Sequence, residues 1–234
     1  MTEEPGQIPL RMRSEDLATW DNWLSRPETA ALEQLLRGQV PEHSAYVWGG
    51  EGMGKSHILQ ACCEAEGLNA RYIPLRDLVD FAPEQVLADT ETARLIAIDD
   101  IDCVESRPRW QEALFALFNA SRETGAKLLV TADKAPQQLL DALPDLRSRL
   151  SSLPVFRMPR FTEDHIAELL ALRGAEAGIE LSGDVARYCS LRLPRHPRAT
   201  VRFINQLDQL SLAQRRAVTI PFVRESGLLR QAEG

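Results

Sequence analysis

A glycine-rich segment at residues 49–56 constrains this chain more than any other feature. It fits the pattern G-x-x-x-x-G-K-[ST] at every fixed position and consists of Gly49, Gly50, Glu51, Gly52, Met53, Gly54, Lys55 and Ser56. Glycines let such a backbone curl until its N–H groups point inward at phosphate oxygens. The lysine can then reach the β- and γ-phosphates, and the serine hydroxyl can bind Mg²⁺. The segment therefore predicts a nucleotide-binding loop.

The residues that flank this loop agree with the prediction. An apolar, strand-like run, Ala45–Trp48, precedes the loop, and a helical pattern that includes Ile58 and Leu59 follows it. Nucleotide-binding loops of this pattern join a strand to a helix. The alternative is a glycine-rich turn with an incidental lysine, and this context disfavours it.

Strand-like and helix-like runs alternate after residue 45, which predicts an α/β fold with a mostly parallel sheet covered by helices. The expected strands are Ala45–Trp48, Arg71–Leu75, Leu95–Ile98, Leu128–Thr131 and Val155–Met158. A helix with one apolar stripe is expected over Arg109–Thr124. From Thr162 onward the pattern is helical. We therefore expect a tail at residues 1–15, an α/β base at 16–159 and a small helical lid at 160–234.

Capping residues and prolines mark the expected helices of the lid. Thr162 can cap the first helix, which Gly178 ends. A second helix is expected to begin near Ser182 and a third at Pro197, with the proline in its first turn. Thr219 is expected to open a short last helix.

Composition excludes several classes of protein. With 44% apolar and 26% charged residues the chain reads as a soluble globular protein. No apolar run is long enough for a membrane span, and the acidic N-terminus does not resemble a secretory signal, so we expect a cytoplasmic protein. The net charge of −7 argues against a large nucleic-acid interface. Four cysteines without C-x-x-C spacing are expected to be buried thiols, and neither they nor the histidines suggest zinc: Cys62, Cys63, Cys103 and Cys189.

Two adjacent acids follow the expected strand Leu95–Ile98. In nucleotide hydrolases with this loop, such a strand is expected to lie beside the strand that precedes the loop. Asp99 would then hold Mg²⁺ through water, and Asp100 would orient the attacking water. The alternative is a buried strand whose acids cap a turn.

The next expected strand also ends in polar side chains. Thr131 and Asp133 follow an apolar run, and such groups face the ligand crevice at the carboxyl edge of a parallel sheet. Either residue could contact the γ-phosphate or the attacking water. A turn-capping role is the alternative.

Several arginines have no obvious acidic partner at helical spacing. Arg149 could reach a neighbouring subunit's γ-phosphate as an arginine finger, or could simply be a solvated surface residue. Arg198, in the first turn of the third lid helix, could bind the protein's own nucleotide. Periodicity alone does not choose between it and its neighbours Arg192, Arg195 and Arg202.

The N-terminal segment has a separate pattern. Gln7, Ile8, Leu10 and Met12 present spaced polar and apolar side chains on a stretch stiffened by Pro9. Such a stretch suits recognition of an extended peptide in a groove, although a tail without a partner fits the same six residues.

Together these motifs resemble the AAA+ module of the bacterial replication initiator DnaA, and more closely the Hda family of short DnaA-homologous regulators. The resemblance covers nearly the whole chain. It rests on T-W-D-N-W at 19–23, W-G-G-E-G-M-G-K-S-H at 48–57, I-D-D-I at 98–101, T-A-D at 131–133, L-P-D-L-R-S-R-L at 143–150 and T-I-P-F-V at 219–223.

The resemblance implies an AAA+ base with a five-stranded parallel sheet, and it assigns roles to single residues. His57 joins the nucleotide-binding loop, Asp133 falls at the sensor-1 position, Arg149 at the arginine finger and Arg198 at sensor 2. The tail matches the hexapeptide that binds the sliding clamp, the beta subunit of DNA polymerase III; the matching residues are Gln7, Ile8, Leu10 and Met12. ADP or ATP with Mg²⁺ is the implied ligand.

The implied function is negative regulation of replication initiation. The clamp-bound protein would stimulate hydrolysis of DnaA-bound ATP through Arg149, with weak or no turnover of its own, and it could form a homodimer or larger oligomer. The helix-turn-helix DNA-binding domain of DnaA is expected to be missing, which agrees with the acidic charge. The alternatives are a self-contained ATPase or helicase loader, for which Asp99, Asp100 and Arg149 would suffice, and a DNA-binding initiator fragment.

Overall fold

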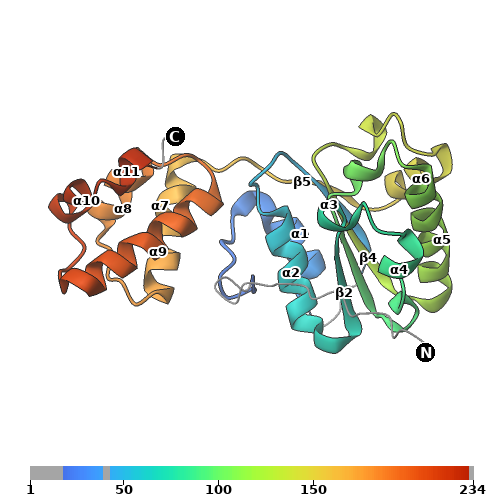
Figure 1. The fold of residues 1–234 in the computed structure, drawn as a ribbon, viewed down its shortest axis with the longest axis horizontal. Coiled ribbons are helices and arrows are strands. Elements are labelled where there is room, and N and C mark those ends of the chain that lie inside the picture. Colours follow the sequence, from blue (N-terminus) through green and yellow to red (C-terminus); the bar gives the residue numbers. More distant parts are fainter. Residues whose placement is uncertain (1–17, 39–42, 232–234) are drawn as a thin grey trace, which may run out of the picture.

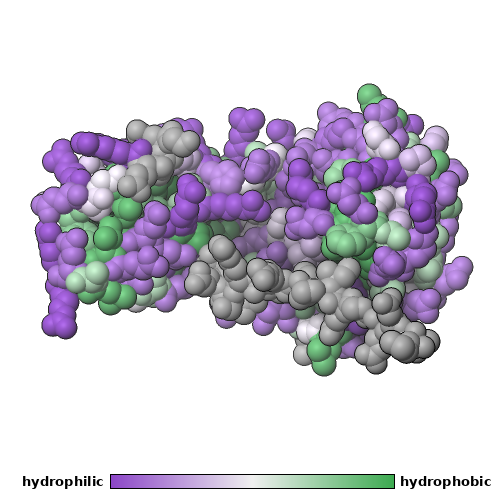
Figure 2. Space-filling view, in the orientation of Figure 1, coloured by the Kyte–Doolittle hydropathy of each residue, from purple (hydrophilic) through white to green (hydrophobic). Residues whose placement is uncertain are grey.

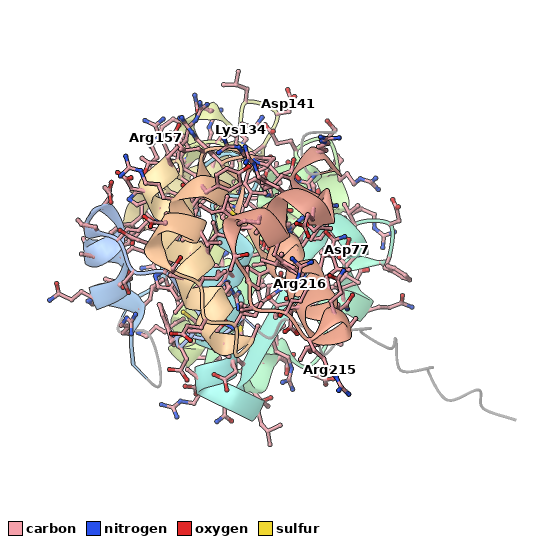
Figure 3. All side chains as sticks on the ribbon, turned by 90° about the vertical axis from the view of Figure 1, so that its left-hand side faces the viewer. Asp77, Lys134, Asp141, Arg157, Arg215 and Arg216 are labelled. Atoms are coloured by element: carbon pink, nitrogen blue, oxygen red, sulfur yellow. The ribbon has the colours of Figure 1, made fainter. Side chains whose placement is uncertain are left out.

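The computed structural model describes residues 18–38 and 43–231. It contains two bodies side by side along the long axis, an α/β base and a helical lid (Figure 1). A segment without helix or strand, residues 158–162, joins them. In the view along that axis the lid lies in front of the base and carries Arg215 and Arg216 (Figure 3). The expected tail at residues 1–15 lies outside the described residues.

Within the described residues, five parallel strands form one sheet in the order β2-β3-β4-β1-β5. The strands are β1 (Ala45–Trp48), β2 (Ala70–Pro74), β3 (Leu95–Asp99), β4 (Lys127–Ala132) and β5 (Val155–Arg157). Each boundary lies within one residue of the sequence-based prediction, so the α/β fold and its five strands are confirmed.

The predicted neighbour of β1 was wrong. β4, and not β3, lies beside β1, with Val47 opposite Thr131 in the register. β3 pairs with the other edge of β4, with Ala97 opposite Leu129. The physical reason is that each strand's own apolar pattern fits any central position of a sheet, whereas the order depends on pairing between distant segments.

The sheet has a buried core on each face, because side chains alternate along every strand. On one face Val47, Ala97 and Leu129 pack against α1 (Ala30–Leu36) and α2 (Lys55–Glu66). On the other face Tyr46, Ile98 and Val130 pack against the remaining helices of the base. Figure 1 shows the sheet between these two groups of helices. The longer helices of the second group are α5 (Pro108–Thr124) and α6 (Pro144–Ser151), and its short ones are α3 (Leu75–Leu78) and α4 (Pro83–Val86).

The lid consists of α7 (Glu163–Glu176), α8 (Gly183–Ser190), α9 (Pro197–Gln214), α10 (Ile220–Ser226) and α11 (Leu228–Gln231). The side-chain oxygens of Thr162, Ser182 and Thr219 accept hydrogen bonds from backbone N–H groups of α7, α8 and α10. The sequence predicted the cap at Thr162 and the starts of the other two helices near Ser182 and Thr219. The helix opened by Thr219 is not the last one, because α11 follows. Leu228 and Leu229 are buried in the lid core, and this burial holds α11 in place.

The surface and the cysteines agree only in part with the expectations from the sequence. On the face drawn in Figure 2, hydrophilic residues cover most of the surface and hydrophobic ones form small patches. In the described part of the chain, no helix is long and apolar enough to cross a membrane. None of the four cysteines forms a disulfide, but Cys63 and Cys103 are only partly buried, contrary to expectation, because each lies at the margin of a core cluster.

Candidate functional site

A cavity of about 990 Å³ lies between the base and the lid, and we call it the cleft. Four parts of the chain line it: the glycine-rich loop with the start of α2, residues 18–24, the carboxyl ends of strands β2 to β4, and the lid helices α7 and α9. It is lined by Gly52, Lys55, Ser56, His57, Asp99, Asp100, Asp133 and Arg198, among other residues. Glu51 and Gly54 of the glycine-rich loop also line the cleft. The cleft therefore contains most of the residues that the sequence predicted to bind nucleotide and Mg²⁺.

The glycine-rich loop is folded as its sequence demands. Gly52 has φ +72° and Gly54 has φ +90°, a region that residues with a Cβ rarely adopt. Lys55 is buried at the start of α2, and its Nζ donates to the carbonyl oxygens of Gly49 at 2.8 Å and Gly50 at 3.1 Å. The loop thus curls around its lysine, which is the shape that presents N–H groups to a phosphate.

Asp133 extends this arrangement to β4. Its Oδ1 lies 2.8 Å from Lys55 Nζ, and its side chain is 42% exposed. The position of β4 beside β1 makes this contact possible, so the corrected strand order brings Asp133 to the loop. Thr131 behaves differently, because it is fully buried and its hydroxyl donates to Asp99. Of the two alternatives left open by the sequence, only Asp133 faces the cleft.

The paired acids have separate environments. Asp99 is buried, and its carboxylate accepts hydrogen bonds from Thr131 and from the Tyr72 hydroxyl at 2.7 Å. Burial beside Asp99 raises the pKa of Tyr72, which keeps the phenol protonated as a donor. Asp100 has φ +57° and its Oδ2 accepts from Arg76 Nε at 2.8 Å. Both acids line the cleft, Asp99 as a buried residue and Asp100 with its side chain partly exposed.

Residues 18–24 form the wall of the cleft beside α2. Trp23 Nε1 donates to the Glu33 carboxylate at 2.8 Å, and its ring packs against Gly54 and His57. His57 Nε2 lies 3.1 Å from the Thr19 carbonyl oxygen, which can only accept, so the ring carries a proton on Nε2 and donates it. Burial lowers the pKa of His57 to about 4. The sequence indicated this segment only by its resemblance.

The lid contributes positive charge to the cleft. Arg198 and Arg202 on α9 line it, whereas Arg195 pairs with Glu163 and Arg192 lies 3.8 Å from the centre of the Tyr188 ring. Of the four lid arginines that the sequence offered, the geometry therefore leaves Arg198 and Arg202 able to face a ligand.

Two lid residues in this region escaped the sequence analysis. Arg173 on α7 also lines the cleft. His196 lies directly against the loop, since a Cβ built on Gly52 would be 2.0 Å from its Nε2. Neither belongs to a recognisable motif, and only the approach of lid to base reveals them.

Arg149 lies apart from the cleft. It is partly exposed on α6, with its guanidinium 5.9 Å from the centre of the Phe115 ring, and in the described part of the chain it has no ion pair. The tail residues Gln7, Ile8, Leu10 and Met12 lie outside the described residues. Among the residues that the structure covers, no three His, Cys, Asp or Glu side chains gather as a metal site.

Two models of known protein families match different parts of the chain. Residues 75–153 match the family model of the bacterial DnaA ATPase domain, and residues 163–226 match the model of the Hda lid domain.

Three solved structures show the same fold. Domain III of the Thermotoga maritima replication initiation protein DnaA is 23% identical, with a TM-score of 0.74 over 91% of this chain and 95% of that one. AMPPCP-bound DnaA from Aquifex aeolicus is 18% identical, with a TM-score of 0.65 over 80% of this chain and 65% of that one. The Thermotoga maritima RuvB Holliday junction branch migration motor is 16% identical, with a TM-score of 0.68 over 90% and 71%. With its DnaA-type AAA+ base followed by an Hda lid, the chain belongs to the Hda-like proteins.

Proposed function

We propose that this protein is a nucleotide-bound regulator of bacterial replication initiation, which binds the sliding clamp and stimulates hydrolysis of DnaA-bound ATP. One observation carries the proposal: a lid of the Hda type follows a base of the DnaA type. A DnaA-like base suits DnaA as a partner, because an arginine finger can be supplied in trans to the nucleotide of a docked protein. A cytoplasmic location follows from this partner.

The cleft fits a nucleotide with Mg²⁺. Lys55 would bind the β- and γ-phosphates, and the backbone N–H groups of the loop would surround them. Arg198 would approach the same phosphates from the lid. The AMPPCP-bound DnaA of similar fold supports an adenine nucleotide. We propose ADP as the resident ligand, and Trp23 and His57, which line the cleft beside the loop, would contact it.

Magnesium in nucleotide sites takes one or two protein oxygens and completes its shell with phosphate and water. Ser56 and Asp99 both line the cleft and supply such oxygens, so the absence of a larger ligand cluster in the described residues does not oppose the ion. When bound, Mg²⁺ would neutralise charge on the phosphates. The Asp99 carboxylate already accepts two hydrogen bonds, which suits contact through water.

The location of Arg149 supports action on a partner's nucleotide. It does not line the protein's own cleft, so it is not placed to assist hydrolysis there. A partly exposed arginine on a surface helix can instead enter the site of a docked neighbour. We therefore assign Arg149 as the finger that acts on DnaA.

Stimulation of DnaA tests this assignment. ATP-loaded DnaA is incubated with DNA-loaded clamp and either the wild-type protein, Arg149→Ala or Arg147→Ala. Arg147 lies on the same helix and is the matched control. We expect Arg149→Ala to lower the stimulated rate by about 1,000-fold or more, the lower end of arginine-finger effects, while Arg147→Ala retains it. Full stimulation by Arg149→Ala would show that the finger is elsewhere.

The clamp is tested separately. Substituting Gln7 and Leu10 by Ala should abolish clamp binding and leave ADP binding intact, because the tail is distinct from the cleft in sequence. A clamp affinity equal to that of the wild type would refute the assignment of the tail.

A self-contained ATPase is the second candidate. This candidate is favoured because Lys55, Asp99, Asp100 and Asp133 all line the same cleft. The rate of ATP hydrolysis by the purified protein decides between the regulator and the self-contained ATPase. Fast hydrolysis without DnaA or clamp would favour the ATPase, and slow hydrolysis would favour the regulator. The molar mass with and without ADP tests the predicted self-association.

A further inference from the structure

Arg76 is a cation of the cleft that no motif contains. It lies on α3, directly after β2, and lines the cleft beside Asp99, Asp100 and Asp133. Its Nε donates to Asp100 Oδ2 at 2.8 Å, and its Nη2 lies 3.9 Å from Asp133 Oδ2. The side chain is 60% exposed, so the guanidinium is oriented by these carboxylates and not by burial.

Asp133 links Arg76 to the lysine of the glycine-rich loop. Its Oδ1 accepts from Lys55 Nζ at 2.8 Å, whereas its Oδ2 is the atom nearer Arg76. The two cations therefore approach opposite oxygens of one carboxylate. Because Lys55 is the residue that reaches the β- and γ-phosphates, the last phosphate of a nucleotide held there would end next to the guanidinium.

The chemistry of Arg76 suits this position. A guanidinium presents five N–H donors in a planar fork that matches phosphate oxygens. In the described part of the chain, no hydrogen bond involves its Nη1, so donors remain for a ligand. The neighbouring carboxylates, Asp100 first, raise the pKa of Arg76, and the group stays charged. Three carboxylates, those of Asp99, Asp100 and Asp133, line the cleft near this guanidinium, so a second cation besides Lys55 favours the binding of an anion there.

We propose that Arg76 binds the terminal phosphate of a nucleoside triphosphate in the protein's own cleft, and so distinguishes triphosphate from diphosphate. The last phosphate of a bound diphosphate lies at Lys55, and Arg76 keeps its hydrogen bond to Asp100. A triphosphate reaches the guanidinium. This inference rests on the nucleotide binding proposed above, but not on the partner or the clamp.

Dissociation constants for AMPPCP and ADP test the proposal on the full chain, by isothermal titration calorimetry with Mg²⁺. The variants are Arg76→Ala, Arg76→Lys and, as a matched control, Arg109→Ala. Arg109 pairs with Glu84 at the surface outside the cleft, so its removal deletes an exposed ion pair of similar kind.

We expect Arg76→Ala to weaken AMPPCP binding about 10- to 100-fold, the range for a hydrogen bond between charged groups, and to change ADP binding less than about 2-fold. Arg76→Lys keeps the charge without the fork and should fall between Ala and the wild type. Arg109→Ala should change neither constant.

Other outcomes overturn the inference. Equal weakening of both ligands would mean that Arg76 only supports the shape of the cleft. Unchanged or tighter AMPPCP binding would mean that it merely neutralises Asp100. If the wild type binds ADP in these titrations, nucleotide binding holds even when the role of Arg76 fails; if it binds neither ligand, the nucleotide-binding proposal itself is wrong.

Discussion

His57 should make the stability of the base depend on pH in a range where few side chains titrate. The ring is partly buried between Thr19 and Trp23, and it donates from Nε2 to a carbonyl oxygen. Burial is the main reason that the pKa of His57 falls to about 4, and the positive charge of Arg173 on the lid lowers it further. In the unfolded chain the pKa of a histidine is about 6.5.

The sign follows from proton uptake. Between pH 6.5 and 4 the unfolded chain binds a proton at this residue and the folded protein does not, so the free energy of unfolding falls as the pH falls. Two-state linkage with these two pKa values gives a loss of about 2 kcal/mol between pH 7.5 and pH 5. Since the ring is only partly buried, water reduces the loss, and we expect about 1 to 2 kcal/mol.

Urea denaturation at pH 7.5, 6 and 5 measures this dependence. The four tryptophans at positions 20, 23, 48 and 110 all belong to the base, so their fluorescence follows its unfolding. His57→Gln can still donate to the Thr19 carbonyl oxygen but does not titrate, and it should flatten the dependence by about 1 to 2 kcal/mol. His43→Gln, which changes an exposed histidine, serves as the control. The same pH dependence in wild type and His57→Gln would refute the reasoning.

Two further predictions concern the surroundings of the cleft. Glu33→Gln should destabilise the base by about 2 to 4 kcal/mol, because its carboxylate accepts from Trp23, Ser25 and Thr29, and an amide NH₂ would face one of these donors; thermal unfolding measures this, and a loss below 1 kcal/mol would contradict it. Gly52→Ala should weaken ADP binding at least 10-fold, since φ is +72° and a Cβ would collide with His196. Adding His196→Ala should restore part of that affinity, and an unchanged double variant would show that backbone strain alone is responsible.

Local patterns made much of the fold predictable. The strands were found within a residue because each combines an apolar run with turn residues at its ends. The cap Thr162 was found because a helix N-terminus needs an acceptor for its free N–H groups, and Ser182 and Thr219, predicted only as helix starts, cap their helices in the same way. The glycine-rich loop and the acids after β3 were recognisable because their chemistry permits few residue types.

What escaped prediction depends on residues far apart in the chain. The order of β3, β4 and β1 is set by pairing between distant segments, and it decides that Asp133 meets Lys55 while Thr131 is buried against Asp99. Arg76 belongs to no motif. One signal could have indicated it, its position directly after a strand at the carboxyl edge of the sheet.

The sequence by itself determined that this chain has a glycine-rich phosphate loop, an α/β base and a helical lid, because those features rest on residue type and short-range periodicity. Only the tertiary structure decided which charged groups share the cleft. The hydrogen bond of Arg76 with Asp100, the contact of His196 with Gly52 and the presence of Arg198 in the cleft arise from the approach of separate elements. The physical reason is that hydrogen bonds and steric contacts act over a few ångströms in space, whatever the separation of their partners in the sequence.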